Sequence, residues 1–246
     1  MRYFIELSYN GTAYCGWQRQ PNASTIQEVI EKMLSMLLRS ETEVVGAGRT
    51  DTGVHASFYV AHFDFVSKDG ADLDCDWLTY KLNVTLPHDI AIKRIFKVAD
   101  DAHARFDAIE REYTYIIEQQ KNPFSRHTSW QLSTKLDVEA MNRAAAYLLQ
   151  HDDFTSFAKL GGGNKTNICD VREAIWRVEG DGKLIFTIKA DRFLRNMIRA
   201  IVGTLVDVGR GKYSAEQFND IIAKRDLSLA SGSAPAQGLF LSNVKY

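Results

Sequence analysis

The feature that most constrains the fold is an alternation of apolar and polar residues, typical of a strand, which opens the chain and recurs in its second half. Residues 3–9 alternate in this way and end at the turn signal Asn10-Gly11, and residues 111–117 begin in a similar manner. Each is followed by a helical pattern and by further strand or hairpin signals. We therefore predict two α+β domains, which a diverged duplication would explain, rather than one parallel sheet.

The first half contains one clear amphipathic helix, which Ser24 or Thr25 can cap. Its apolar positions recur with a helical period and are Ile26, Val29, Ile30, Met33, Leu34, Leu37 and Leu38. Strand patterns follow at residues 43–45, 57–65 and 90–96. The next segment is polar, so we place the domain boundary there and expect one domain over residues 1–100 and another over residues 101–246.

The second half repeats this organisation. A helix is predicted from about Asp137, and strands at residues 175–178 and 184–190 flank the hairpin signal Gly180-Asp181-Gly182. Residues 191–208 have the pattern of a long helix. Ser214 opens a capping box, which predicts a further helix.

Composition restricts the class of protein. The 246 residues carry a net charge of −1, so a nucleic-acid partner would require positive charge gathered on one face. Three cysteines without a CxxC pair indicate a reducing cytosol, so we expect a cytoplasmic protein. The six histidines lack zinc-ligand spacing, so no metal site is expected. The apolar runs are too short for a bilayer span and no signal-peptide core opens the chain, so no membrane association is expected.

The glycine-rich segment GAGRTDTGVHA, residues 46–56, is the first candidate site. In one interpretation it is a tight turn in which glycines adopt positive φ and Asp51 accepts backbone N–H bonds. In the other it displays the Asp51 carboxylate on a rigid loop, and the glycines let a substrate backbone come close. A reactive carboxylate must stay ionised, which a nearby cation favours by lowering its pKa. Arg49 is one candidate for that cation.

A second candidate lies on the predicted helix over residues 191–208. Arg192, Arg195 and Arg199 fall on one side of its helical wheel, beside the small Gly203, which we expect to leave room for a ligand against that face. No glutamate is interleaved with them, and arginine suits the geometry of phosphate and carboxylate groups. A solvated charged face and a face that binds an anionic partner are both consistent with this pattern.

Two further patterns point weakly to a nucleic acid. Tyr113 and Tyr115 share one side of a strand, as in a core pair or in a base-stacking platform. The glycine-rich segment 161–165 lacks the ending of a phosphate loop, so we interpret it as a mobile loop near which Lys159 and Lys165 can touch a polyanion.

Taken together, these segments resemble the tRNA pseudouridine synthase A family over nearly the whole chain. The most specific is GRTDTGVHA at residues 48–56, in which Thr52 stands where a smaller residue is common. The others follow in the family's order and are YNG at 9–11, GWQRQ at 16–20 after the atypical Cys15, ARF at 104–106, REYTY at 111–115, DFTSF at 153–157, FLRNMIR at 193–199 and APAQGL at 234–239.

The resemblance implies isomerisation of uridine to pseudouridine at tRNA positions 38–40, in the anticodon stem-loop, without a cofactor. It implies a homodimer whose chains have two RRM-like α/β domains that share a central antiparallel sheet. The first domain would carry the catalytic loop and the second would complete the RNA cleft.

The resemblance also assigns roles to single residues. Asp51 matches the catalytic aspartate, Tyr113 the tyrosine that packs on the target base, and Arg199 the basic partner of the aspartate. Arg49 matches an arginine that reaches into the RNA, and Leu239 an apolar residue that lines the uracil pocket. To these we add three expected RNA contacts, Arg192, Arg195 and Lys165.

Two rival classes are a metal-dependent nuclease and a non-catalytic RNA-binding protein. A nuclease should show clustered carboxylates near Asp51, and residues 46–56 contain one. A protein that only binds RNA has no need of a carboxylate facing a polyanion. In the isomerase, a stacked uracil must first be extruded. Arg49 could then fill the vacated space, while Asp51 acts as a nucleophile on the sugar or ring or as a base at the sugar.

Overall fold

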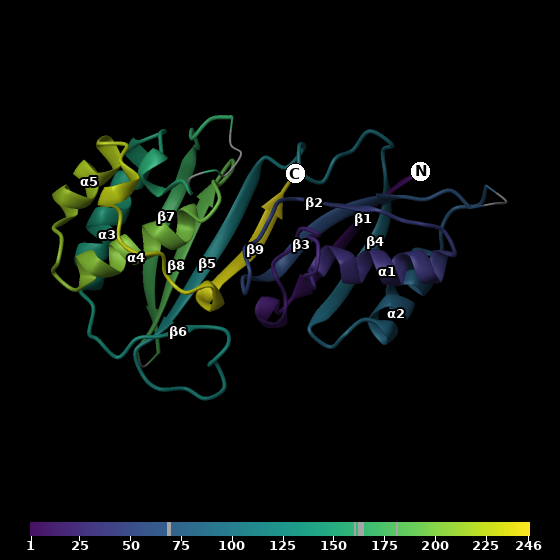
Figure 1. The fold of residues 1–246 in the computed structure, drawn as a ribbon, viewed down its shortest axis with the longest axis horizontal. Coiled ribbons are helices and arrows are strands. Elements are labelled where there is room, and N and C mark those ends of the chain that lie inside the picture. The colour runs from purple at the N-terminus through teal and green to yellow at the C-terminus, as the bar shows by residue number, and fades with distance from the viewer. Residues whose placement is uncertain (68–69, 160, 162–164, 181) are drawn as a thin grey trace. The chain divides into compact units, whose positions relative to one another are not determined.

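The structure is a computed structural model that describes residues 1–67, 70–159, 161, 165–180 and 182–246 (Figure 1). It divides into two compact units, an N-terminal unit of Met1–Ile109 with Leu241–Tyr246 and a C-terminal unit of Glu110–Phe240. Helices and mostly antiparallel strands occur in both units, which confirms the predicted α+β class.

The N-terminal unit contains an antiparallel sheet in the order β4-β1-β3. β1 (Arg2–Tyr9) is central and is buried over most of its length, between β3 (His55–Asp64) and β4 (Ile90–Val98). The short β2 (Val44–Gly46) pairs with β3. These strands lie close to the positions that the alternating patterns predicted.

Two helices belong to this unit. α1 (Ile26–Leu38) starts where the sequence predicted, with the Thr25 hydroxyl as its cap. α2 (Cys75–Thr85) has no counterpart in the sequence prediction. Its buried positions are only Leu78 and Leu82, so its apolar period is weak.

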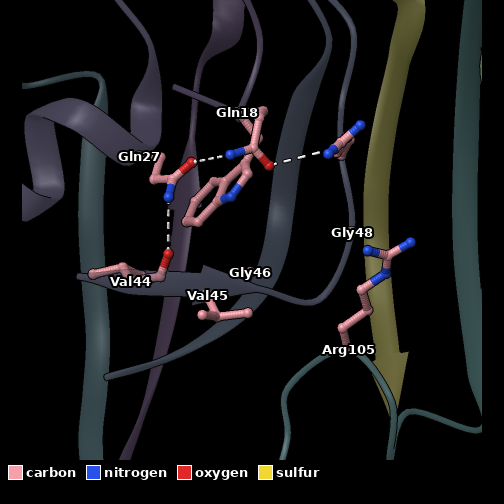
Figure 2. Close-up of a pocket in the computed structure, with 9 residues that line it drawn as sticks. Gln18, Gln27, Val44, Val45, Gly46, Gly48 and Arg105 are labelled. Carbon is pink, nitrogen blue, oxygen red and sulfur yellow. Dashed lines mark hydrogen bonds between the residues drawn. The ribbon is translucent and has the colours of Figure 1, made fainter. Parts of the chain in front are cut away.

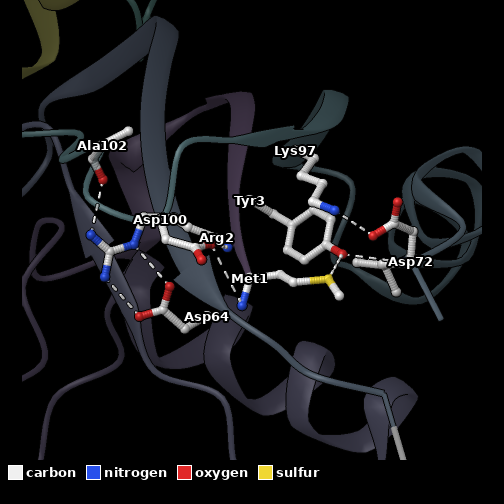
Figure 3. Close-up of polar contacts among 9 residues, drawn as sticks. Met1, Arg2, Tyr3, Asp64, Asp72, Lys97, Asp100 and Ala102 are labelled. Carbon is white, nitrogen blue, oxygen red and sulfur yellow. Dashed lines mark hydrogen bonds and ion pairs between the residues drawn. The ribbon is translucent and has the colours of Figure 1, made fainter. Parts of the chain in front are cut away.

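The segment after β4 stays with the N-terminal unit, so the division falls at Ile109 and differs from the boundary expected after residue 100. The Arg2 guanidinium holds this segment by donating to the carbonyl oxygen of Ala102 at 3.0 Å (Figure 3). The end of the chain attaches to it as well, because the Tyr246 hydroxyl donates to the carbonyl oxygen of Ala104 at 2.7 Å. Such long-range bonds leave no local signal in the sequence.

The C-terminal unit has an antiparallel sheet in the order β5-β8-β7, with β6 parallel to β5. α3 packs against β7, α4 and α5. Its strands and α-helices are β5 (Glu110–Glu118), β6 (Trp130–Gln131), α3 (Val138–Ala146), β7 (Val171–Glu179), β8 (Lys183–Ala190), α4 (Met197–Gly209) and α5 (Ala215–Ala223). α5 begins with the predicted capping box at Ser214. β9 (Leu239–Lys245) begins in this unit and ends in the N-terminal unit.

Short 3₁₀ turns complete the described structure. They are η1 (Gly11–Ala13), η2 (Tyr147–Gln150), η3 (Thr155–Phe157), η4 (Leu227–Leu229) and η5 (Ala236–Gly238). Two predicted features fall partly outside the described residues. These are the hairpin signal at Asp181 and the glycine-rich loop at Gly162, Gly163 and Asn164.

The sequence predicted a long helix that starts at residue 191. That predicted start is wrong, because α4 starts at Met197. Asn196 has a φ of 65°, in the left-handed region, which a right-handed helix does not accommodate. The Asp191 carboxylate accepts the N–H of Arg192 at 2.7 Å, a local bond that competes with helical hydrogen bonding. Arg192 and Arg195 therefore lie outside the helix, and the predicted stripe of three arginines on one helix face is wrong.

Candidate functional site

The loop between β2 and β3, which carries most of residues 46–56, is fastened to the last residue of β1 and to the first residue of η1. The hydroxyl oxygen of Tyr9 lies 2.9 Å from Oγ1 of Thr50. The N–H of Gly11 donates to Nδ1 of the fully buried His55 at 3.0 Å. These bonds hold the middle and the end of the loop, so its remaining side chains project from a rigid base.

Close packing explains two glycines at this loop. Gly16 has a φ of +84°, and a Cβ there would lie 2.3 Å from the carbonyl oxygen of Thr50. A Cβ at Gly46 would lie 2.1 Å from the hydroxyl oxygen of Tyr59 and 2.6 Å from the ring of Trp17. The two aromatic rings stack with their centroids 4.1 Å apart, so neither can move away easily.

Asp51 and Arg49 differ in their exposure to solvent and in their hydrogen bonds. Asp51 is half-buried, and its carbonyl oxygen accepts the N–H of Val54 at 3.1 Å in a turn where Gly53 has a φ of +77°. The turn that the sequence suggested is therefore present. Arg49 is exposed, and its Nε donates to Oε1 of Gln18 at 3.3 Å.

Arg49 borders a pocket of the N-terminal unit, and Arg105 borders it as well (Figure 2). The other lining residues are Trp17, Gln18, Gln27, Val44, Val45, Gly46 and Gly48. The wall is open at Gly48, where a Cβ would meet nothing within 4 Å. Two guanidinium groups beside amide groups form a surface suited to phosphate oxygens or to the edge of a base.

The imidazoles of two histidines accept backbone hydrogen bonds from the turn that contains Arg105. Nδ1 of His103 accepts the N–H of Arg105, and Nδ1 of the buried His62 accepts the N–H of Ala104, both at 3.1 Å. Burial, with smaller contributions from the charges of Arg2 and His103, lowers the pKa of His62 to about 4. Its imidazole is therefore neutral near pH 7 and available as an acceptor. No role was predicted for Arg105, because no local pattern in the sequence links it to β2.

In the C-terminal unit, the residues expected at the target base lie on β5, α4 and β9. Tyr113 is half-buried on β5, with its ring edge-on to Phe193 at 5.3 Å between centroids. Arg199 exchanges two hydrogen bonds with Ala234, since its Nε donates to the carbonyl oxygen at 2.7 Å and its own carbonyl oxygen accepts the N–H at 2.9 Å. It thereby anchors the segment that leads to Leu239, which is buried at the start of β9.

The three expected RNA contacts of this unit lie in irregular chain. Arg192 is half-buried, and its Nη1 donates to the carbonyl oxygen of Thr166 at 3.4 Å. Arg195 is exposed, and its carbonyl oxygen accepts the N–H of Lys159 at 3.2 Å. Lys165 is exposed. The structure thus brings the arginine segment next to the lysine-bearing segment of the same unit.

The prediction that Gly203 leaves room for a ligand is wrong. A Cβ at Gly203 would lie 2.1 Å from the carbonyl oxygen of Gly232. The chain itself therefore occupies the space beside this face of α4.

Within the described residues, no three His, Cys, Asp or Glu side chains are grouped so that they could hold a metal ion. Over the same part of the chain, none of the helices combines the length and the apolar character needed to cross a membrane.

The comparisons with known proteins agree on one family. A family model described as tRNA pseudouridine synthase matches residues 7–107 and 144–246. A tRNA pseudouridine synthase A of Bacteroides fragilis is 52% identical over 245 residues, which cover 100% of this chain and 96% of that protein. One of Bacteroides thetaiotaomicron is 52% identical over 247 residues, covering 100% and 90%. One of Acetivibrio thermocellus is 41% identical over 243 residues, covering 98% and 97%. The chain belongs to the tRNA pseudouridine synthase family.

Proposed function

We propose that this isomerase of tRNA uridines acts at tRNA positions 38–40, in the anticodon stem-loop, with Asp51 as its catalytic carboxylate. The observation that carries the proposal is the fastened loop between β2 and β3. It holds Asp51 two residues from Arg49, and Arg49 borders a pocket that a second guanidinium also lines. A rigid support is what a reacting group needs in order to meet its substrate in one geometry.

The chemistry requires the target uridine outside the base stack, at a cost on the order of a few kcal/mol. Arg49 fills the vacated space, and the open wall at Gly48 admits the RNA backbone. The bond between C1′ and N1 breaks, the uracil turns, and C5 bonds to C1′, while C5 loses its proton and N1 gains one. Asp51 attacks C1′, attacks the ring or removes a proton from the sugar, and each role starts from the ionised carboxylate.

The other site residues receive roles in the same proposal. Tyr113 packs on the target base, Leu239 lines the uracil pocket, and Arg199 is the cation that keeps the catalytic carboxylate ionised. Phosphate contacts are assigned to Arg192, Arg195 and Lys165.

We also propose that the protein is a homodimer and that it is located in the cytoplasm. Its three cysteines are free thiols, as suits a reducing compartment. Light scattering on the purified protein should give a mass about twice the chain mass of 27.8 kDa. A mass equal to that of one chain would remove the homodimer from the proposal.

The test of Asp51 uses a tRNA transcript with tritium at C5 of its uridines. The wild type should release tritium to water and leave the tRNA uncut. Asp51→Asn and Asp51→Ala should abolish release and keep tRNA affinity within about tenfold, because removing a negative charge does not weaken phosphate contacts. Asp220→Asn, at an exposed position on α5, is the matched control and should behave as the wild type.

The same assay separates the rival classes. Cleaved tRNA would indicate a nuclease, and bound tRNA with no tritium release would indicate a protein that only binds RNA. Substantial turnover by either Asp51 variant would remove Asp51 from the chemistry.

A further inference from the structure

Three hydrogen bonds in series connect a buried carboxylate on α1 to the guanidinium of Arg49. Nε2 of Gln27 donates to Oε1 of Glu31 at 2.9 Å, and Nε2 of Gln18 donates to Oε1 of Gln27 at 2.9 Å. Nε of Arg49 then donates to Oε1 of Gln18 at 3.3 Å (Figure 2). The proposed function gives a role to Arg49 and none to the other three residues.

The orientation of the Gln18 and Gln27 amides is determined by neighbouring groups that can only donate or only accept a hydrogen bond. The carbonyl oxygen of Val44 accepts from Nε2 of Gln27 at 2.9 Å, and the backbone N–H of Arg19 donates to Oε1 of Gln27 at 2.9 Å. A carbonyl oxygen cannot donate and an N–H cannot accept, so the Gln27 amide cannot be reversed. Gln18 must therefore turn its NH₂ toward Gln27 and its oxygen toward Arg49.

Both ends of this series are fixed. Glu31 is only 7% exposed, and its Oε1 also accepts the backbone N–H of Val44 at 3.0 Å. At the other end, the carbonyl oxygen of Gly48, the residue before Arg49, accepts the hydroxyl of Tyr59. A long side chain that is held before its partner arrives loses less conformational entropy on binding.

We propose that Gln18 and Gln27 are positioning residues that hold the Arg49 guanidinium in the orientation in which it enters the RNA. This inference rests on the role that the proposed function gives to Arg49. Gln18 supplies the acceptor, Gln27 sets the direction of that acceptor, and Glu31 anchors the series in the interior of the N-terminal unit.

Gln18→Met is a clean test, because Oε1 of Gln27 keeps the N–H of Arg19 and no buried group loses its last partner. The control is Gln20→Met in the same segment, whose amide donates to the carbonyl oxygen of Cys15 outside this series. In single-turnover tritium release with saturating enzyme, Gln18→Met should lower the maximal rate about fivefold. The Kd for tRNA should stay within about twofold, and Gln20→Met should match the wild type. A wild-type rate for Gln18→Met would overturn the proposal.

A double-mutant cycle shows whether Gln18 acts through Arg49. In an Arg49→Ala background, Gln18→Met should cause no further loss of rate. Loss by the same factor in both backgrounds would overturn the proposal, because Gln18 would then act elsewhere. A wild-type rate for Arg49→Ala alone would remove Arg49 from the proposed function and this inference with it.

A second measurement does not depend on turnover. The Nε–H of Arg49, followed by ¹⁵N NMR in the protein without RNA, should exchange faster with water in Gln18→Met and at the wild-type rate in Gln20→Met. Unchanged exchange in Gln18→Met would overturn the inference. Faster exchange there, combined with no tritium release by the wild type, would support the positioning and contradict the proposed function.

Discussion

Lowering the pH should weaken the N-terminal unit through His62. This imidazole is 4% exposed, and its Nδ1 accepts the N–H of Ala104, a bond that exists only while Nδ1 is unprotonated. Arg2 and His103 disfavour its protonation, and Asp64 and Asp107 favour it. Burial is the largest effect, and together these lower the pKa of His62 from 6.5 to about 4.

The sign and size of the effect follow from proton linkage. Between pH 6.5 and about 4 the unfolded chain binds a proton at this imidazole and the folded chain does not. The stabilisation is therefore complete above pH 6.5 and is lost as the pH falls. The difference between the two pKa values corresponds to about 3 kcal/mol in full, of which about 2 kcal/mol is lost by about pH 5.

Urea unfolding of the wild type and of His62→Asn at about pH 7.5, 6 and 5 measures this loss. The asparagine oxygen can accept the N–H of Ala104 but does not titrate, so the variant should lose about 2 kcal/mol less than the wild type between the two extremes. The pKa of Asp64, which the hydrogen bond from Arg2 lowers most, lies below its usual value, so this carboxylate titrates below the pH range of the comparison in both proteins. Equal pH dependence in the two proteins, or a measured His62 pKa near 6.5, would refute the reasoning.

Three further outcomes are expected. Gly46→Ala should destabilise the protein by about 1–3 kcal/mol in thermal or urea unfolding, since the new methyl group would meet the Tyr59 hydroxyl, and an unchanged stability would contradict this packing. Arg192→Ala and Arg195→Ala should weaken tRNA binding and lower the slope of log K against log salt by about one each, whereas an unchanged slope would exclude phosphate contacts. Tyr113→Phe should keep tRNA affinity because the ring remains, and should slow tritium release if the phenol helps to move the C5 proton; wild-type release would reduce Tyr113 to a packing surface.

The elements that the sequence predicted well are those whose signals are local. Thr25 before a regular apolar period located α1, and Ser214 located α5 through its capping box. α2 was missed, because two buried leucines four residues apart give a weak period and Trp77 is exposed beside them. The start of α4 was placed too early because apolar periodicity continues across Asn196, and periodicity does not register a single left-handed residue.

The sequence predicted the residue types of the candidate site better than it predicted the contacts that these residues make. The glycine pattern around Asp51 indicated a loop, and the loop is present. The sequence offered Arg49 as a partner of that carboxylate, and it gave no sign that the Nε of Arg49 donates to Gln18, which belongs to a segment about thirty residues earlier. Gly203 was ambiguous for a related reason, because a small residue on a helix leaves space for a ligand or for another part of the same chain, and here Gly232 fills it.

The hydrogen bonds that hold each guanidinium explain why the arginines should have different roles toward the RNA. Arg49 donates to an amide whose direction is dictated by a buried carboxylate and by backbone groups, so its plane is set before RNA arrives. Nη1 of Arg192 donates to the carbonyl oxygen of Thr166 at 3.4 Å, near the limit of a hydrogen bond, so this guanidinium is held less firmly. A fixed plane suits the replacement of an extruded base, for which one orientation fits. A looser guanidinium suits phosphates, because electrostatic attraction tolerates many orientations. Disturbing the support of Arg49 should therefore change the rate of isomerisation, whereas removing Arg192 or Arg195 should change the affinity and its dependence on salt.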